Sequence, residues 1–204
     1  MAVVDEIATH DEKRESLAGA DLIRHIGLRR VMTEDYRAHG RAFFSPGLHA
    51  VWVYRIGVWA ATLPRGIRSA VSVLYMLGHW FCKVFYGIEL ERSAKIGRRF
   101  RIGHQGAIVI HRFATFGDDC LVRQGVTLGS GAGWTKGRGP VIGDNVHFGP
   151  GAIVVGNIRI GDNVRVGPNC VVTTDVPSDR VLFAPPARVF PRKADDNDMH
   201  EDMD

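Results

Sequence analysis

Cysteine is scarce in this chain, and the few cysteines lie far apart. The 204 residues include three, Cys82, Cys120 and Cys170, and no CxxC pair occurs. An odd number of widely spaced cysteines argues against both a disulfide framework and a zinc clip. The scarcity fits a protein of the reducing cytoplasm.

The sequence also has little that is typical of a membrane span or a secretory signal. Its most apolar stretch, SAVSVLYMLGHWFC at 69–82, is too short to cross a bilayer and contains His79. We interpret it as a buried helix, with peripheral contact at the inner face of the membrane left open. The first residues, MAVVDEIATHDEKRE, are polar and acidic, unlike the start of a secretory signal. We therefore expect a cytoplasmic location.

Basic runs with interleaved aromatic residues are absent as well. The formal net charge is only +4, with a pI near 9.2. Because nucleic-acid-binding surfaces gather Lys and Arg into patches or stripes, no nucleic-acid partner is expected. A mild positive balance does suit an acidic small molecule, such as a phosphate-bearing cofactor.

The spacing of apolar residues along the chain changes near Gly87. Residues 1–87 place apolar side chains at helical spacing, which predicts a small N-terminal helical domain. Within it we interpret the aromatic residues Trp80, Phe81 and Phe85 as packing. The end of the chain, 191–204, is acidic and without aromatic residues, and we expect it to be a disordered tail.

Between these segments, over 88–190, the sequence repeats every six residues. One aliphatic or aromatic position recurs at that interval, at Ile142, Phe148, Val154, Ile160, Val166 and Val172. Gly, Asn or Asp follows in most units, and these residues tolerate the positive φ of a tight corner. A short fixed period of this kind indicates stacked coils, each dependent on its neighbours. The sequence therefore predicts a mainly β fold, a parallel β-helix.

One interval breaks the repeat. GSGAGWTKGRGP, at 129–140, is longer than two units and holds Trp134, Lys136 and Arg138. We expect it to loop out of the coil. Loops extruded from a rigid scaffold are common places for binding residues.

Three stretches together resemble the serine acetyltransferase family of hexapeptide-repeat acyltransferases. They are GIELERSAKIGRRFRIGHQGAIVI at 87–110, GDDCLVRQGVTLGSG at 117–131, and the segment from IGDNVHFGPGA to PPARV at 142–189. The first two look nearest to the exopolysaccharide or colanic-acid-type branch. The resemblance implies a left-handed β-helix, an O-acetyltransferase with acetyl-CoA as co-substrate, and a homotrimer. Pairing of two trimers stays open.

The resemblance also implies a catalytic pair. His104 matches the family's general base, and Glu89 matches the carboxylate that orients it, where the family usually has Asp. An imidazole titrates near neutral pH, so it can take the proton of an attacking hydroxyl. A carboxylate on its other nitrogen fixes the tautomer. The alternative for His104 is a solvated histidine at a corner of the coil.

A metal site is the rival interpretation of the histidines. Trimeric β-helix carbonic anhydrases bind zinc through three histidines, two of them close in sequence. The spacing of His104 and His111 differs from theirs. Since zinc needs three well-placed protein ligands, we expect no metal, and we interpret His111 and His147 as surface residues.

By the same resemblance, further residues bind the two substrates. Those matched to the thioester end of the donor are Gly129 and Ser130; those matched to its pantetheine groove are Gly149, Pro150, Gly167 and Pro168. Arg165 is matched more loosely to the CoA phosphates, and Arg138 to the position that faces an acceptor carboxylate.

The acceptor is where the sequence departs from the serine enzymes. Those enzymes carry an acid before the base histidine and a histidine before the loop proline, whereas this chain has Gly103 and Gly139. We therefore expect a glycan or other small-molecule acceptor, with a sugar hydroxyl of an exopolysaccharide precursor as the main interpretation. Serine O-acetylation is the alternative, and a non-catalytic trimeric scaffold is a third. Because the chain ends in the acidic Asp204, we do not expect a cysteine synthase complex.

Overall fold

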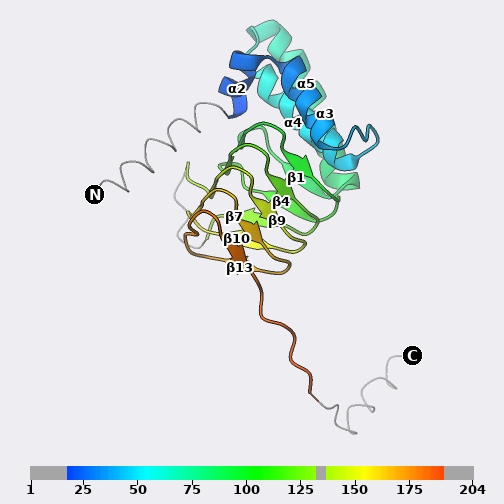
Figure 1. The fold of residues 1–204 in the computed structure, drawn as a ribbon. Helices are drawn as coiled ribbons and strands as arrows, with labels where there is room; N and C mark the ends of the chain where they lie inside the picture. Colours follow the sequence, from blue (N-terminus) through cyan, green and yellow to red (C-terminus); the bar gives the residue numbers. More distant parts are fainter. Residues whose placement is uncertain (1–17, 132–136, 191–204) are drawn as a thin grey trace, which may run out of the picture.

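Helices come first along the chain and short strands follow (Figure 1). The computed structural model describes residues 18–131 and 137–190. Trp134, Lys136 and the expected acidic tail lie outside these residues. The described helices are α2 (Gly19–Ile26), α3 (Leu28–Ala38), α4 (Pro46–Ala60) and α5 (Arg65–Phe85).

The strands form three parallel sheets, which are the three faces of a triangular coil. Face A has the order β1-β4-β7-β10-β13, face B the order β11-β8-β5-β2, and face C the order β14-β12-β9-β6-β3. Along the chain the strands pass from B to C to A and then start the next coil. Their bounds are β1 Ile88–Leu90, β2 Lys95–Ile96, β3 Arg101–Ile102, β4 Ile108–Ile110, β5 Thr115–Phe116, β6 Leu121–Val122, β7 Thr127–Gly129, β8 Val141–Ile142, β9 His147–Phe148, β10 Ile153–Val155, β11 Arg159–Ile160, β12 Arg165–Val166, β13 Val171–Val172 and β14 Val181–Leu182.

The six-residue column fills the interior of this coil, so the predicted parallel β-helix is confirmed. The repeat positions from Ile142 to Val172 are all at most 3% exposed. Phe100, Phe116 and Phe148 make edge-to-face contacts across successive coils, with ring centroids 5.1 and 6.3 Å apart. Because each coil covers the apolar side chains of the next, stability depends on neighbouring coils in contact.

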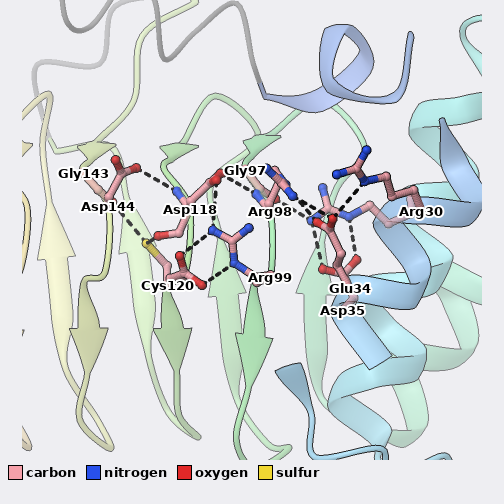
Figure 2. Close-up of polar contacts among 12 residues, drawn as sticks. Arg30, Glu34, Asp35, Gly97, Arg98, Arg99, Asp118, Cys120, Gly143 and Asp144 are labelled. Carbon is pink, nitrogen blue, oxygen red and sulfur yellow. Dashed lines mark hydrogen bonds and ion pairs between the residues drawn. The ribbon is translucent and has the colours of Figure 1, made fainter. Parts of the chain in front are cut away.

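The corners between faces B and C are held by a ladder of aspartates (Figure 2). Asp118 accepts a hydrogen bond from the backbone N–H of Arg98 at 2.7 Å. Asp144 accepts one from the N–H of Asp118 at 2.8 Å, and Asp162 one from the N–H of Asp144 at 2.7 Å. Each side chain therefore satisfies a backbone donor in the coil before it, as buried and half-buried N–H groups require.

A buried ion pair joins the helices to the first coil. Arg55 of α4 and Asp35 of α3 are both fully buried, and Arg55 Nε donates to the Asp35 carboxylate at 2.9 Å. The same guanidinium donates to the carbonyls of Ile96 at 2.9 Å and Gly97 at 2.6 Å. One arginine thus connects two helices and a corner of the coil.

Helix α5 differs from the sequence-based expectation of a buried helix. Residues 69–82 are helical, but only Tyr75 and Cys82 of α5 are buried. Phe81 and Phe85 stack with ring centroids 4.7 Å apart, and Trp80 contacts Phe85 at 6.1 Å. The three side chains therefore pack on one another, but they are 58%, 42% and 63% exposed (Trp80, Phe81, Phe85) and are not buried in the core. The reason is that α5 packs on α4 and β1 from one side only. Within 18–131 and 137–190, none of the helices combines the length and hydrophobicity needed to cross a bilayer.

We predict that Arg55→Met destabilises the protein by about 3–5 kcal/mol, because it leaves the Asp35 carboxylate buried and unpaired. Arg24→Met is the control: it breaks the Arg24–Asp21 pair, whose side chains are 59% and 57% exposed, and should cost about 1 kcal/mol or less. Urea denaturation of both variants measures the difference. Equal losses would show that the buried pair does not hold the helices to the coil.

Candidate active site

The corner between faces C and A carries half of the candidate site residues from the sequence analysis. We call this edge of the coil, residues 103–107, 123–126, 149–152 and 167–170, the CA edge. Its segments stack through backbone bonds: the N–H of Gly125 donates to Gly106, that of Gly151 to Gln124, and that of Asn169 to Pro150, at 2.8–2.9 Å. His104 therefore lies on the same edge as the two Gly-Pro pairs, 149–150 and 167–168.

Glycine is required at parts of this edge by the stacking itself. A Cβ on Gly149 would lie 2.7 Å from the backbone N of Pro168, and one on Gly167 would lie 2.6 Å from the carbonyl oxygen of Leu182. Successive coils thus approach closely here. The close packing of the coils alone therefore explains these two glycines.

His104 and Glu89 lie in adjacent coils, yet no hydrogen bond joins them. Glu89 is the outward residue of β1 and pairs in register with Val109 of β4, the strand that follows His104. The Glu89 carboxylate accepts instead from Lys83 Nζ of α5 at 2.7 Å. His104 is exposed, and among the described residues its side chain has no hydrogen-bond partner. The pairing with the carboxylate expected from the sequence is not formed in this structure.

Lys83 was not singled out by the sequence analysis. It lies in the last turn of α5, and the Glu89 carboxylate raises the pKa of its ammonium group. Nothing in the local sequence pointed to it, because the contact depends on how α5 meets β1. Its ion pair directs the Glu89 carboxylate toward α5 on the outer side of face A.

The remaining substrate-binding candidates lie on other parts of the coil. Gly129 ends β7 and Ser130 follows, at the far end of face A from His104. Arg138 lines a cavity of about 430 Å³ over face B, next to Lys95, Thr115 and Arg159. Arg165 begins β12 on face C, where it donates to the carbonyl of Asn145 at 2.5 Å. Within one chain, therefore, Arg138 and His104 lie on different edges of the coil.

Gly139 is packed too tightly to carry a side chain. A Cβ there would lie 2.7 Å from the carbonyl oxygen of Phe113 and 3.0 Å from Nδ1 of His111. His111 is half-buried, and burial lowers the pKa of its imidazole, with a smaller effect of Arg112. An imidazole thus occupies the space beside residue 139, a proximity that the sequence did not reveal because these positions are far apart along the chain.

Gln124 is the second residue that the sequence analysis missed. It lies on the CA edge, one coil after His104. Its Oε1 atom is buried and, among the described residues, is the one buried side-chain oxygen or nitrogen without a hydrogen-bond partner. A buried acceptor left unpaired costs free energy, so a ligand that donates an N–H or O–H here would gain from it.

Two of the cysteines are unsuited to act as nucleophiles. Burial raises the pKa of the Cys82 thiol to about 11 and that of Cys120 to about 12. Since the thiolate is the reactive form, neither is activated. Within the part of the chain that the structure describes, no three His, Cys, Asp or Glu side chains gather as a metal would require.

The repeats match a known family model, and the chain matches named proteins. Residues 139–174 match the bacterial transferase hexapeptide (six repeats). The serine acetyltransferase of Mycobacterium tuberculosis is 39% identical over 149 residues, which cover 72% of this chain and 62% of that protein. That of Staphylococcus epidermidis is 41% identical over 145 residues, or 70% and 64% of the two chains. Over these residues the chain is similar to the serine acetyltransferases.

Solved structures agree on the fold. Serine acetyltransferase isoform 3 of Entamoeba histolytica, in complex with cysteine, has a TM-score of 0.67 at 24% identity, over 87% of this chain and 65% of that one. The Brucella abortus enzyme, in complex with coenzyme A, has a TM-score of 0.67 at 22% identity, over 78% and 66%. The predicted left-handed β-helix with a helical lead-in is confirmed by this likeness. The chain spans less than two thirds of the length of the curated relatives named above.

These relatives support the serine acetyltransferase side of the resemblance. They give no support to the exopolysaccharide branch that the motifs at 87–110 and 117–131 had suggested.

We predict that the same substitution destabilises the protein at one glycine of the site and has little effect at another. Gly149→Ala should lower stability by about 1–3 kcal/mol, because the methyl group overpacks the contact with Pro168. Gly129→Ala should change it by at most about 0.5 kcal/mol, since nothing lies within 4 Å of a Cβ there. Thermal unfolding of the two variants checks this. Equal melting temperatures would mean that the coils do not approach as closely as described.

Proposed function

We propose that this protein is an acetyl-CoA-dependent O-acetyltransferase whose general base is His104. The observation that carries the proposal is the CA edge, where an exposed imidazole and two close-packed Gly-Pro turns share one corner of a rigid coil. The homology to serine acetyltransferases supports the same reaction class. An acyl transfer by direct attack needs an exposed base beside an extended binding surface, which this edge supplies.

The reaction needs a base for the acceptor hydroxyl and a donor for the oxyanion. His104 takes the proton of the acceptor hydroxyl as that oxygen attacks the thioester carbonyl. The tetrahedral intermediate then expels the CoA thiolate, which receives the proton back from the imidazolium, and the acetyl ester is released. Such general base catalysis contributes about 10²- to 10⁴-fold. A backbone N–H near Gly129 is our candidate to stabilise the oxyanion, a role that fixed donors perform well. Because Gly129 lies at the far end of face A from His104 within one chain, we propose that this donor comes from a neighbouring protomer.

We propose a supporting role for two further residues, Gln124 and Glu89. The pantetheine arm of acetyl-CoA carries two amide N–H groups, and the unpaired Oε1 of Gln124 is a fitting acceptor for one of them. Glu89 orients His104 only if its carboxylate leaves Lys83, a rotation that a side chain 31% exposed has room to make. We assign the groove contacts to Gly149, Pro150, Gly167 and Pro168.

For the acceptor we propose the hydroxyl of L-serine. The curated relatives at 39–41% identity are named serine acetyltransferases, which outweighs the sugar acceptor favoured by the motifs alone. Arg138 is then the cation for the serine carboxylate. A sugar hydroxyl remains a second candidate because of a specific observation: Gly139 has no room for the histidine that the serine enzymes carry there.

We also propose that the working unit is a homotrimer. His104 and Arg138 lie on different edges of one coil, so a complete site needs Arg138 of a neighbouring protomer. Apolar surface is available for such contacts: Leu77 and Trp80 of α5, and Val171 on face A, are each 58–63% exposed. The expectation that the chain avoids a cysteine synthase complex has no support here, since its basis, the tail, lies outside the described residues.

The acceptor is tested by CoA thiol release from acetyl-CoA with L-serine, nucleotide sugars or oligosaccharides offered in turn. We expect turnover with L-serine at micromolar to millimolar concentrations, the usual KM range. Turnover with sugars alone would replace serine by the second candidate. Binding of acetyl-CoA without any turnover would favour the non-catalytic scaffold instead.

We predict that His104→Ala lowers kcat by about 100-fold or more while the Kd for CoA stays nearly unchanged, because the imidazole acts on the proton and not on the donor. His25→Ala, at an exposed position of α2, is the control and should retain full activity. Steady-state kinetics and calorimetry provide the two readouts. Unchanged turnover in the His104 variant would remove the assignment of the base.

A further inference from the structure

A second cavity lies away from the CA edge, between α3 and the first three coils. Its volume is about 720 Å³. Helix α3 supplies one wall, and the corners between faces B and C, with the start of face C, supply the other. The lining residues are Glu34, Arg37, Ala38, Arg98, Arg99, Arg101, Asp119, Asn145 and His147. Four arginines thus face a shared space with only two carboxylates.

Both carboxylates are already paired with an arginine. Arg98 donates from Nε and Nη2 to the two oxygens of Glu34 at 2.8 and 2.7 Å, a contact visible in Figure 2. Arg99 donates in the same way to Asp119 at 2.6 Å from each nitrogen. These bidentate contacts have the geometry that guanidinium and carboxylate groups favour. Neither acid is left to neutralise a further cation.

Arg37 and Arg101 are the cations that remain. Among the described residues, neither makes an ion pair with a carboxylate. Arg37 is exposed at the end of α3, and Arg101 is half-buried on β3. The cavity therefore presents two uncompensated guanidinium groups from opposite walls.

His147 lies in line with Arg101 on face C. The strand register places Leu121 next to Arg101, His147 next to Leu121, and Arg165 next to His147. Burial lowers the pKa of the His147 imidazole, and Arg165, Arg101 and Arg123 lower it further. The ring is then neutral near pH 7 and offers one N–H, and among the described residues it has no hydrogen-bond partner for it.

We propose that this cavity is a binding site for a phosphate-type dianion, held by Arg37, Arg101 and His147. Guanidinium groups from two walls match the oxygens of a phosphate or sulfate, and a neutral imidazole N–H adds a third donor. The dianion has two possible sources, a free oxyanion or the 3′-phosphate of CoA. Only the second source rests on the proposed function.

The experiment first uses free anions. The melting temperature of the full chain is measured with inorganic phosphate or sulfate and with chloride at the same ionic strength. We expect the dianions to raise it by about 2–4 °C at saturating concentration, since a ligand of the folded state stabilises by mass action. The measurement does not involve acetyl transfer, so it stands whether or not the proposed activity is found.

Matched variants then locate the effect. Arg37→Gln and Arg101→Gln should each abolish the dianion shift, whereas Arg180→Gln should keep it. Arg180 is exposed and lies outside the cavity. Its substitution changes the net charge by the same amount as the substitutions of Arg37 and Arg101. If Arg101→Gln fails to fold by circular dichroism, Arg37→Gln decides alone, because Arg37 is on the surface. Absence of a dianion-specific shift, or a shift that survives in the Arg37 variant, would overturn the site.

The last experiment distinguishes a free oxyanion from the 3′-phosphate of CoA as the bound dianion. Calorimetry compares CoA with dephospho-CoA, which lacks the 3′-phosphate, on the wild-type protein and on Arg37→Gln. A preference for CoA of about tenfold that disappears in the variant identifies the 3′-phosphate as the dianion. Equal affinity for the two, together with the phosphate shift, identifies a free oxyanion.

Discussion

The close stacking of six-residue coils is the constraint on which the rest of this molecule depends. Parallel strands about 4.8 Å apart leave no room between corners, so a Cβ at Gly149 or Gly167 would overlap the backbone of the next coil. The same spacing carries the aspartate ladder from Arg98 to Asp162. A site built on such an edge keeps its geometry without a ligand, which is what an acyl transfer by direct attack requires.

Buried polar contacts of α4 attach the helices to this coil: Tyr54 donates to the carbonyl of Ala94 and accepts from the N–H of Ile96. Arg55 reaches from α4 to Asp35 and to the carbonyls of Ile96 and Gly97. On the other side, α5 contacts the coil near β1 and leaves most of its apolar face exposed. The same contact brings Lys83 to Glu89. The helical region therefore contacts a candidate catalytic residue, Glu89, directly.

The six-residue repeat made the fold predictable from the sequence. The contacts between individual side chains of the site could not be predicted in this way. The apolar positions from Ile142 to Val172 recur every six residues, which neither the helical nor the ordinary strand period explains. This spacing therefore predicted a coil. Sequence also placed His104 and the two Gly-Pro turns at corners, and counting units puts them on one edge. The Lys83–Glu89 pair, the His111–Gly139 contact and the unpaired Gln124 depend on residues from different elements, which the repeat does not relate. The exposure of Trp80 was missed for a similar reason. The sequence of an apolar helix does not show whether its apolar face packs against its own chain or against another protomer.

The central claim is that one coil edge presents His104 and that a neighbouring protomer supplies Arg138. Mixing two variants, His104→Ala and Arg138→Ala, tests it most directly. Each variant alone should be nearly inactive, and unfolding and refolding them together should restore part of the wild-type activity, because some sites then combine an intact His104 with an intact Arg138. If the refolded mixture is no more active than the separate variants, the two residues do not act in one site shared between protomers.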